Sequence, residues 1–323
     1  MIVYSPKERV LILTFTINPS IDKTVTVSKV SFEEIIRTSS SVNFVGGKGI
    51  NISRAIKTLG GETIASGFLG GFTGEWIKKQ LCEYEKIPND FVNITGETRV
   101  NLTILDMHSK GEIHLVEAGP SITDRELEEL FKKVKKLVRK AKFIVFSGSI
   151  PQNVPTDIYA RLIKIAKKEN SSTITVLDTS GEPLRYGFEE KPSIVKPNAQ
   201  ETAYLIGERI DSLKKASSAL VFFSQKSIEF PIISLGRKGV IALYQGTIYE
   251  VIPPQITPVS TVGSGDSLLA GILFSLEEGK DIQEALRVGV SCGIANALKE
   301  GAGVLKKSDI RKFYRMIRVK KTK

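Results

Sequence analysis

Short apolar runs alternate with amphipathic segments along most of this chain. The runs are expected to be strands, and several are continuously apolar, which is typical of parallel strands buried on both faces. The expected strands are residues 10–16, 143–147, 174–178, 193–195, 231–235 and 240–244. Since helical patterns lie between them, the sequence predicts an α/β fold with an open, mostly parallel sheet covered by helices.

The helical pattern is clearest after Thr123. Thr123 can cap a helix, and Glu126, three residues later, completes a capping box. Apolar residues then recur at helical spacing, at Leu127, Leu130, Phe131, Val134, Leu137 and Val138. The sequence therefore predicts a helix that begins directly after Thr123.

Two segments break the alternation of strands and helices. Residues 22–44 and 96–117 alternate in the β manner without a long helix. They are expected to form a small separate sheet over the active edge of the main sheet. No Pro/Ser-rich linker or internal repeat intervenes, so we expect one domain over 1–323, with a lid formed by about 19–45 and 95–117.

Composition narrows the class of protein. The chain has 323 residues, of which 41% are hydrophobic and 25% charged, as in an ordinary soluble enzyme. It has no apolar run of transmembrane length, and residues 1–9 do not resemble a signal peptide. Cys82 and Cys292 lack metal-ligand spacing and are expected to be reduced, buried thiols. These features favour a cytoplasmic protein without a membrane partner.

The net charge of +11 raises the question of whether the protein binds nucleic acid. The lysines, however, lie on the solvated faces of amphipathic helices and are not interleaved with aromatic residues. We therefore expect no nucleic-acid partner. A positive field would instead attract small anionic substrates.

The first of two glycine clusters is Gly46-Gly47-Lys48-Gly49-Ile50-Asn51. Glycines before a helix let the backbone approach a ligand, and the helix N-terminus offers free N–H groups. Lys48 adds charge, and Asn51 can form a hydrogen bond with a hydroxyl. The spacing matches neither a P-loop nor a dinucleotide fingerprint, so this cluster alone is as often structural as functional.

The second cluster, Thr261-Val262-Gly263-Ser264-Gly265-Asp266, also precedes a helical pattern. Amides of Gly263 to Asp266 can point at one anion and form a hole for a transferring phosphoryl group. Asp266 is either a helix cap or a general base, and taken alone the two readings are equal. Beside an anion hole, a carboxylate is well placed to accept a hydroxyl proton.

Together and in this order, the two clusters resemble the signatures of the ribokinase-like (PfkB) sugar kinases. Six further segments agree in register, namely residues 18–22, 67–70, 96–99, 147–151, 196–201 and 234–239. The resemblance covers about 11–303. It implies a ribokinase-like fold with a β-sheet lid, and an enzyme that uses ATP and Mg²⁺ to phosphorylate a sugar.

The resemblance also implies roles for matching residues. The sugar-binding residues would be Asp22, Gly46, Gly47, Lys48 and Asn51. The general base would be Asp266, with an anion hole from Gly263, Ser264 and Gly265. Asn198 and Glu201 would organise Mg²⁺ and phosphates, partly through water. The nucleotide side would comprise Lys196, Ser234, Gly236, Gly239 and Thr261, with Asn296 in the wall of the adenine pocket. Asp22 and Asn198 also suit turns, which remains an alternative for both.

Residues that suit a phosphorylated sugar narrow the subgroup. Arg99 and Lys48 supply cations for a non-reacting phosphate, and the planar fork of arginine can bind two phosphate oxygens. Arg99-Val100-Asn101 resembles the Thr-Arg-x-Asn segment of bacterial 1-phosphofructokinases, and residues 70–74, 178–182 and 259–263 resemble that subgroup too. This implies fructose 1-phosphate as the substrate, with Arg99 and Asn101 in its site.

Two alternatives remain open. Tagatose-6-phosphate kinases share much of the subgroup pattern, and a catalytically silent sugar-phosphate sensor could use the same fold. Lids of this family pair between subunits in some members, so a homodimer is a candidate assembly. Residues 1–9 have no counterpart in the family pattern.

Overall fold

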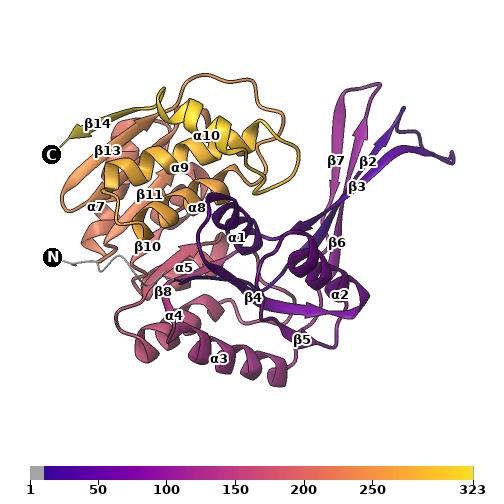
Figure 1. Ribbon diagram of the computed structural model, residues 1–323, viewed down its shortest axis with the longest axis horizontal. Coiled ribbons are helices and arrows are strands. Elements are labelled where there is room, and N and C mark those ends of the chain that lie inside the picture. Colours follow the sequence, from indigo (N-terminus) through magenta and orange to yellow (C-terminus); the bar gives the residue numbers. More distant parts are fainter. Residues whose placement is uncertain (1–10, 323) are drawn as a thin grey trace.

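The main sheet has ten strands in a computed structural model that describes residues 11–322 (Figure 1). Their order is β14-β13-β12-β11-β10-β9-β8-β1-β4-β5. In chain order the bounds are Leu11–Thr16 for β1, Thr63–Gly70 for β4, Val92–Ile94 for β5, Ala141–Ser147 for β8, Ile174–Asp178 for β9, Ile194–Val195 for β10, Phe230–Ser234 for β11, Val240–Tyr244 for β12, Thr247–Ile252 for β13 and Arg318–Thr322 for β14.

The predicted mostly parallel sheet is confirmed. Strands β11, β10, β9, β8, β1, β4 and β5 are parallel, whereas β12, β13 and β14 continue the sheet in antiparallel fashion. All six expected strands are present within the described residues and differ from the expectation only at their ends. Residue 10 and the unassigned segment 1–9 lie outside the described residues.

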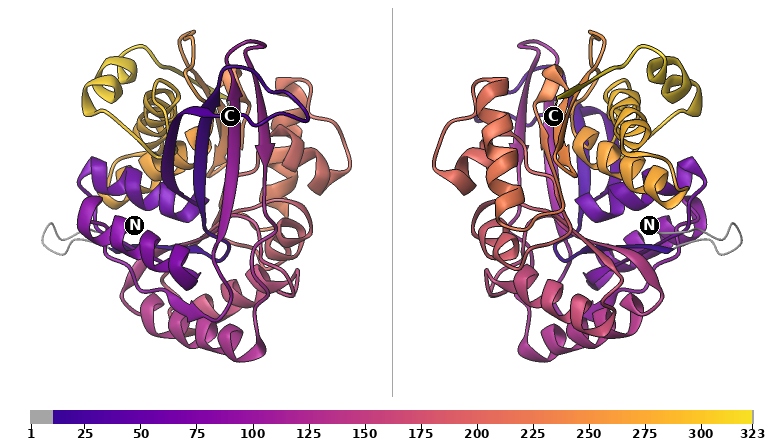
Figure 2. Two further views of the ribbon diagram at one scale, coloured as in Figure 1. Left: turned by 90° about the vertical axis from the view of Figure 1, so that its right-hand side faces the viewer. Right: turned by 90° about the vertical axis from the view of Figure 1, so that its left-hand side faces the viewer.

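Helices cover both faces of this sheet (Figures 1 and 2). One face carries α3 (Asp124–Val138), α4 (Ile158–Glu169), α5 (Gly181–Glu189), α6 (Ala199–Ile206) and α7 (Leu213–Gln225). The other carries α1 (Lys48–Leu59), α8 (Ser264–Glu277), α9 (Ile282–Ala297) and α10 (Lys307–Tyr314). Helix α2 (Gly71–Lys79) runs into the π-helical turn η1 (Gln80–Tyr84), and η2 (Gly236–Lys238) is a short 3-10 turn. Cys82 on η1 is exposed, so the expectation of a buried thiol is wrong there, whereas Cys292 is buried as expected.

The predicted cap of α3 is confirmed. Thr123 Oγ1 accepts from the Glu126 amide at 3.3 Å, and Glu126 Oε2 accepts from the Thr123 amide at 2.8 Å. A second capping box, which the sequence analysis did not assign as such, joins Asn198 and Glu201 at the start of α6.

A separate small sheet projects from the body (Figures 1 and 2). Its order is β3-β2-β6-β7, with bounds Ser20–Val27 for β2, Thr38–Gly46 for β3, Arg99–Asp106 for β6 and Gly111–Leu115 for β7. The register places Asp22 beside Asn101 and Ser20 beside Arg99. Because side chains alternate along a strand, these four share one face of the small sheet.

The order of the main sheet creates a crevice at β1. From β1 the chain passes to β4 and β5 on one side and then to β8, β9 and β10 on the other. Such a reversal leaves an opening at the carboxyl ends of the strands, where α/β proteins bind ligands. The register brings Thr16, Ser147 and Asp178 together at this edge.

Candidate active site

The N-terminus of α8 faces the crevice. Gly263 precedes it with φ 78° in the left-handed region, and a Cβ there would lie 2.6 Å from the Cβ of Ala302. Glycine therefore allows the turn to press against the segment after α9. The first N–H groups of a helix have no partner within it, so the turn through Ser264 and Gly265 forms a cradle for an anion.

Asp266 is buried in the first turn of α8, with 6% of its surface exposed. Its Oδ2 accepts a hydrogen bond of 2.8 Å from Asn51 Nδ2 on α1. The alternative of a helix cap is wrong, because Gly263 is the N-cap and no side chain caps α8. Burial, together with the nearby charge of Asp178, raises the pKa of Asp266, although Lys48 and Asn51 oppose the shift. A carboxylate with a raised pKa is a stronger proton acceptor.

Close contacts shape the loop before α1. A Cβ on Gly46 would lie 2.2 Å from Asp22 Oδ2, and one on Gly47, at φ 124°, would lie 2.6 Å from Thr16 Cγ2. These two positions therefore need glycine. The loop is thereby held between the end of β1 and the small sheet, with Lys48 at the start of the helix.

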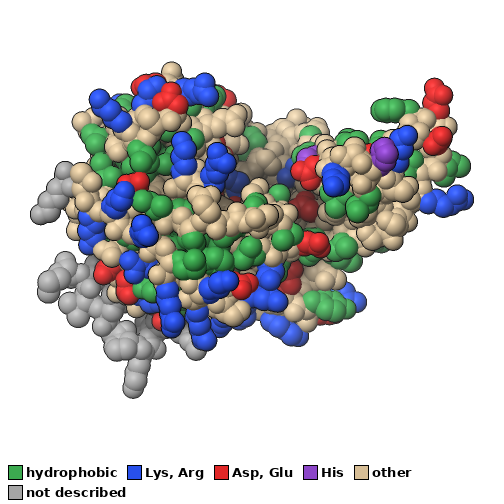
Figure 3. Space-filling model, turned by 90° about the horizontal axis from the view of Figure 1, so that it is seen from above, with side chains coloured by type: hydrophobic (Ala, Val, Ile, Leu, Met, Phe, Trp, Pro, Cys, Tyr) green, Lys and Arg blue, Asp and Glu red, His purple; other side chains and the backbone are tan. Residues whose placement is uncertain are grey.

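The small sheet contributes a polar cluster. Asn101 Nδ2 donates to Asp22 Oδ1 at 2.8 Å and to Ser20 Oγ at 3.1 Å, and Ser20 Oγ itself donates to Asp22 Oδ1 at 2.8 Å. The carboxylate of Asp22 is thus oriented beside Gly46. Viewed from above, the surface is hollowed between the small sheet and the body, and charged side chains are visible in the hollow (Figure 3).

Arg99 joins three segments at the base of the small sheet. Its Nη1 donates to Glu117 O at 2.8 Å, and its Nη2 donates to Asn18 O at 2.9 Å and to Ser149 Oγ at 3.3 Å. Ser149 belongs to a segment used only for the family resemblance, and the contact adds it to the candidate site.

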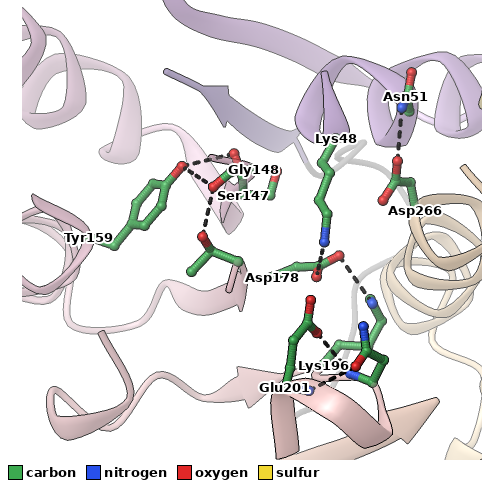
Figure 4. A network of polar contacts seen from close by, with 11 residues as sticks. Lys48, Asn51, Ser147, Gly148, Tyr159, Asp178, Lys196, Glu201 and Asp266 are labelled. Carbon is green, nitrogen blue, oxygen red and sulfur yellow. Dashed lines mark hydrogen bonds and ion pairs between the residues drawn. The ribbon is translucent and has the colours of Figure 1, made fainter. Parts of the chain in front are cut away.

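Asp178 is the main residue that the sequence analysis missed. It ends β9 with 1% of its surface exposed and lies between two ammonium groups (Figure 4). Lys48 Nζ is 2.9 Å from its Oδ1, and Lys196 Nζ is 3.2 Å from its Oδ2. An acidic residue at the end of a mostly apolar parallel strand was the available signal.

These contacts determine the protonation states of Asp178 and Lys48. Burial alone would raise the pKa of Asp178, but Lys196 and Lys48 outweigh it and lower that pKa. Burial alone would lower the pKa of Lys48, but Asp178, Asp266 and Glu201 raise it above its ordinary value. Asp178 is therefore ionised and Lys48 protonated at neutral pH.

A cavity of about 350 Å³ gathers most of the expected nucleotide-side residues. Those that line it are Ser234, Gly236, Gly239 and Thr261, together with Asn198 from the expected metal site and Ser264 and Gly265 from the anion cradle. Its apolar walls include Val240, Ile256, Leu268, Val290, Ile294 and Ala297. Lys196 lies outside this lining and points to Asp178 instead.

Asn296 does not line this cavity, so its expected place in the pocket wall is wrong. The residue is fully buried, and its side chain supports the anion cradle from behind. Asn296 Nδ2 donates to Val262 O at 2.7 Å, and Oδ1 accepts from the Gly303 amide at 2.7 Å. Its neighbours Ile294 and Ala297 form the wall, because they lie on the adjacent face of α9.

The residues of the site suit Mg²⁺ only where substrate phosphates supply further ligands. Within residues 11–322, no group of three or more His, Cys, Asp or Glu side chains is arranged to hold a metal. Asn198 Oδ1 accepts from the Glu201 amide, and Glu201 Oε2 accepts from the Asn198 amide, each at 2.8 Å. The other carboxylate oxygen of Glu201 lies outside this box and can hold a metal-bound water. Such sparse protein ligation suits Mg²⁺, which keeps waters and takes oxygens from substrate phosphates.

Comparison with known proteins gives consistent results. Residues 16–308 match the model of the pfkB family carbohydrate kinases. A tagatose-6-phosphate kinase from Staphylococcus epidermidis is 34% identical over 96% of this chain and 99% of that protein. The tetrameric inhibited form of phosphofructokinase-2 from Escherichia coli has a TM-score of 0.87 at 29% identity, over 95% of this chain and 99% of that one.

A possible 1-phosphofructokinase from Thermotoga maritima has a TM-score of 0.85 at 24% identity, over 97% of this chain and 100% of that chain, and this likeness supports the fold. Among residues 11–322 there is no helix with both the length and the apolar character to cross a bilayer.

Replacing Asp266 with Asn should separate proton transfer from folding. We expect kcat to fall by about 10²–10⁴-fold, because an amide cannot accept the proton. The melting temperature should not drop, because burial already disfavours the charged form of Asp266. The acid limb of the wild-type kcat profile should lie above the ordinary range of an aspartate, since activity is lost as pH falls through the raised pKa.

The control is Asp281→Asn, which changes a true helix cap on α9 and should leave kcat intact. Substrate phosphates also titrate, so the limb assigned to Asp266 must be missing from the residual activity of Asp266→Asn. A kcat near the wild-type value in the folded variant would contradict the role of general base.

Proposed function

The chain belongs to the pfkB family of carbohydrate kinases, and from this membership we propose that it transfers the γ-phosphoryl group of ATP to the C6 hydroxyl of fructose 1-phosphate. The products would be fructose 1,6-bisphosphate and ADP. One observation carries the proposal. A buried carboxylate, Asp266, lies at the anion cradle between the nucleotide cavity and the polar cluster of the small sheet.

The proposed chemistry follows from this placement. Asp266 accepts the proton of the sugar hydroxyl as the hydroxyl oxygen attacks the γ-phosphorus of ATP. The bond from that phosphorus to the bridging oxygen of ADP breaks. The α8 amides and the ammonium of Lys48 stabilise the charge on the transferred group. Mg²⁺ bound with ATP would supply further positive charge, with Glu201 and Asn198 holding it through water.

The sugar would lie between the two sheets. Asp22, held by Asn101 and Ser20, would accept hydrogen bonds from sugar hydroxyls. Arg99 and Ser149, which contact each other, would bind the phosphate that does not react. In this proposal residues 19–45 and 95–117 act as the lid of a single domain and exclude water during transfer.

Tagatose 6-phosphate is the second candidate substrate. It is favoured by the 34% identity to a tagatose-6-phosphate kinase over 96% of this chain. Each candidate is a ketohexose with a phosphate at one end and a free primary hydroxyl at the other. The same phosphate-binding residues, Arg99 and Ser149, and the same base, Asp266, could therefore serve both sugars. The choice between the two depends on contacts to the ring hydroxyls.

We also propose a homodimer formed by the small sheets. The face opposite Asp22 exposes apolar side chains, with 42% of Ile113 and 53% of Leu115 accessible. Neighbouring Leu102 and Ile104 on the same face are half-buried. Exposed apolar surface of this kind is typical of a face that meets another chain.

A screen of ADP release should identify the substrate. We expect fructose 1-phosphate to give the highest kcat/KM among fructose 1-phosphate, tagatose 6-phosphate, fructose 6-phosphate, fructose and ribose. Unphosphorylated sugars should be poor, because they leave Arg99 without its anionic partner. A higher kcat/KM for tagatose 6-phosphate would establish the second candidate, and a preference for ribose would refute a phosphosugar site.

Replacing Arg99 with Ala should weaken binding of the transition state by about 2–4 kcal/mol, as expected for loss of one partner of a charged pair. Most of this loss should appear in KM for the phosphosugar, with KM for ATP unchanged. The control Arg139→Ala removes a surface ion pair with Glu169 and should change neither. Equal weakening of both substrates would indicate that Arg99 is only structural.

Light scattering on Ile113→Lys should test the dimer. A buried lysine at the interface lacks a partner, so we expect the variant to be monomeric and the wild type dimeric. Leu213→Lys places the same change at a residue of equal exposure, 42%, on α7, and should remain dimeric. A monomeric wild-type protein at assay concentration would contradict the proposal.

A further inference from the structure

Asp178 joins two loops that the family resemblance assigns to different substrates. Lys48 belongs to the loop on the sugar side and begins α1, whereas Lys196 follows β10 beside the nucleotide cavity. Their ammonium groups lie on different oxygens of one carboxylate, at 2.9 and 3.2 Å (Figure 4). A single buried side chain is thus the common partner of both cations.

Hydrogen bonds hold the backbone around Asp178 in place. The backbone oxygen of Asp178 accepts from the Gly148 amide at 3.1 Å, and Thr179 Oγ1 donates to Gly148 O at 2.7 Å. The buried hydroxyl of Tyr159 donates to Ser147 O and Gly148 O, each at 3.0 Å (Figure 4). These hydrogen bonds hold the end of β9, and with it the backbone of Asp178, against the end of β8.

Charge balance explains why the site needs this residue. Lys196 has only 4% of its surface exposed, and burying an ammonium without a counter-charge is costly. The charged groups that face the cluster are Lys48 from α1, Lys196 after β10, Asp266 from α8 and Glu201 from α6. Asp178 is the one among them that contacts both lysines directly.

We propose that Asp178 is a positioning residue for phosphoryl transfer, which holds Lys48 and Lys196 as a pair of cations at the meeting point of the two substrates. Each ammonium has three donors. Lys48 Nζ donates one of them to Asp178 Oδ1, and Lys196 Nζ forms an ion pair with Oδ2 without a hydrogen bond, so donors remain on both for phosphate oxygens. The negative charge of Asp178 also acts on Asp266 and keeps it a better proton acceptor. This inference rests on the proposed kinase function for its kinetic consequences only.

The kinetic test is Asp178→Asn, which keeps the shape of the side chain and removes its charge. We expect kcat to fall by about 100-fold, because the lysines lose their fixed geometry. KM for ATP should stay the same or decrease, since both lysines keep their positive charge. The acid limb of the kcat profile should move to lower pH, because the charge of Asp178 raises the pKa of Asp266.

Two further variants make the kinetic result specific. Asp178→Glu keeps the charge with altered geometry, so it should return the acid limb to its wild-type position while kcat stays low. Asp157→Asn makes the same chemical change in the surface ion pair with Arg161 and should leave kcat, KM and the pH profile as they are. An unmoved acid limb, or a large rise in KM for ATP, would overturn the proposal.

A second measurement needs no substrate. Thermal unfolding of the ligand-free protein should show Asp178→Asn melting about 5 °C lower, because two ammonium groups lose their shared counter-charge. Lys196→Met removes one of these cations, so the double variant should melt higher than the sum of the single effects predicts. If the two changes in melting temperature simply add in the double variant, the proposal that Asp178 is the shared counter-ion of the two lysines is overturned. If no phosphosugar is phosphorylated, the proposed function fails, while this cycle still decides the role of Asp178.

Discussion

The pairing of buried charges at the carboxyl ends of the parallel strands is the constraint on which this structure depends. Phosphoryl transfer needs cations and a base in a place from which water is excluded, yet each unpaired charge there opposes folding. Asp178 meets both needs, because it neutralises two lysines while leaving them donors. The pKa of Asp178 is lowered and that of Asp266 is raised, although both carboxylates are buried. The difference follows from direct contact with lysines in one case and with a neutral amide in the other.

Two helix N-termini meet at this cluster, and the contact between them is also polar. Asn51 on α1 donates to Asp266 on α8, and Arg54 Nη1 donates to Asn51 Oδ1 at 3.0 Å. Arg54 also reaches Val45 O at the end of β3 and Ala302 O beside Gly263. The orientation of the candidate base is thereby tied to the small sheet and to the anion cradle.

Sequence patterns predicted correctly those features that depend on residues close together in the chain. The capping box at Thr123 and Glu126 was correctly predicted, because its two partners lie three residues apart on one helix. Most of the residues expected on the nucleotide side line one cavity, because glycine turns and their flanking strands have recognisable sequences. Asn296 itself does not line the cavity, whereas its neighbours Ile294 and Ala297 do. Its expected place came from the family resemblance, which indicated the part of the chain around Asn296 and not the face of α9 on which each residue lies.

The sequence by itself determined the parallel sheet, the two glycine-rich helix starts and the presence of Asp266 at one of them. Apolar period, glycine spacing and chain order carry this information within short segments. Only the tertiary structure decided that Asp178 is the common partner of Lys48 and Lys196, which lie far from each other in the chain. It also decided that Asp266 contacts Asn51 and caps nothing. Such pairings depend on the order in which strands lie side by side, and no local pattern of residues specifies that order.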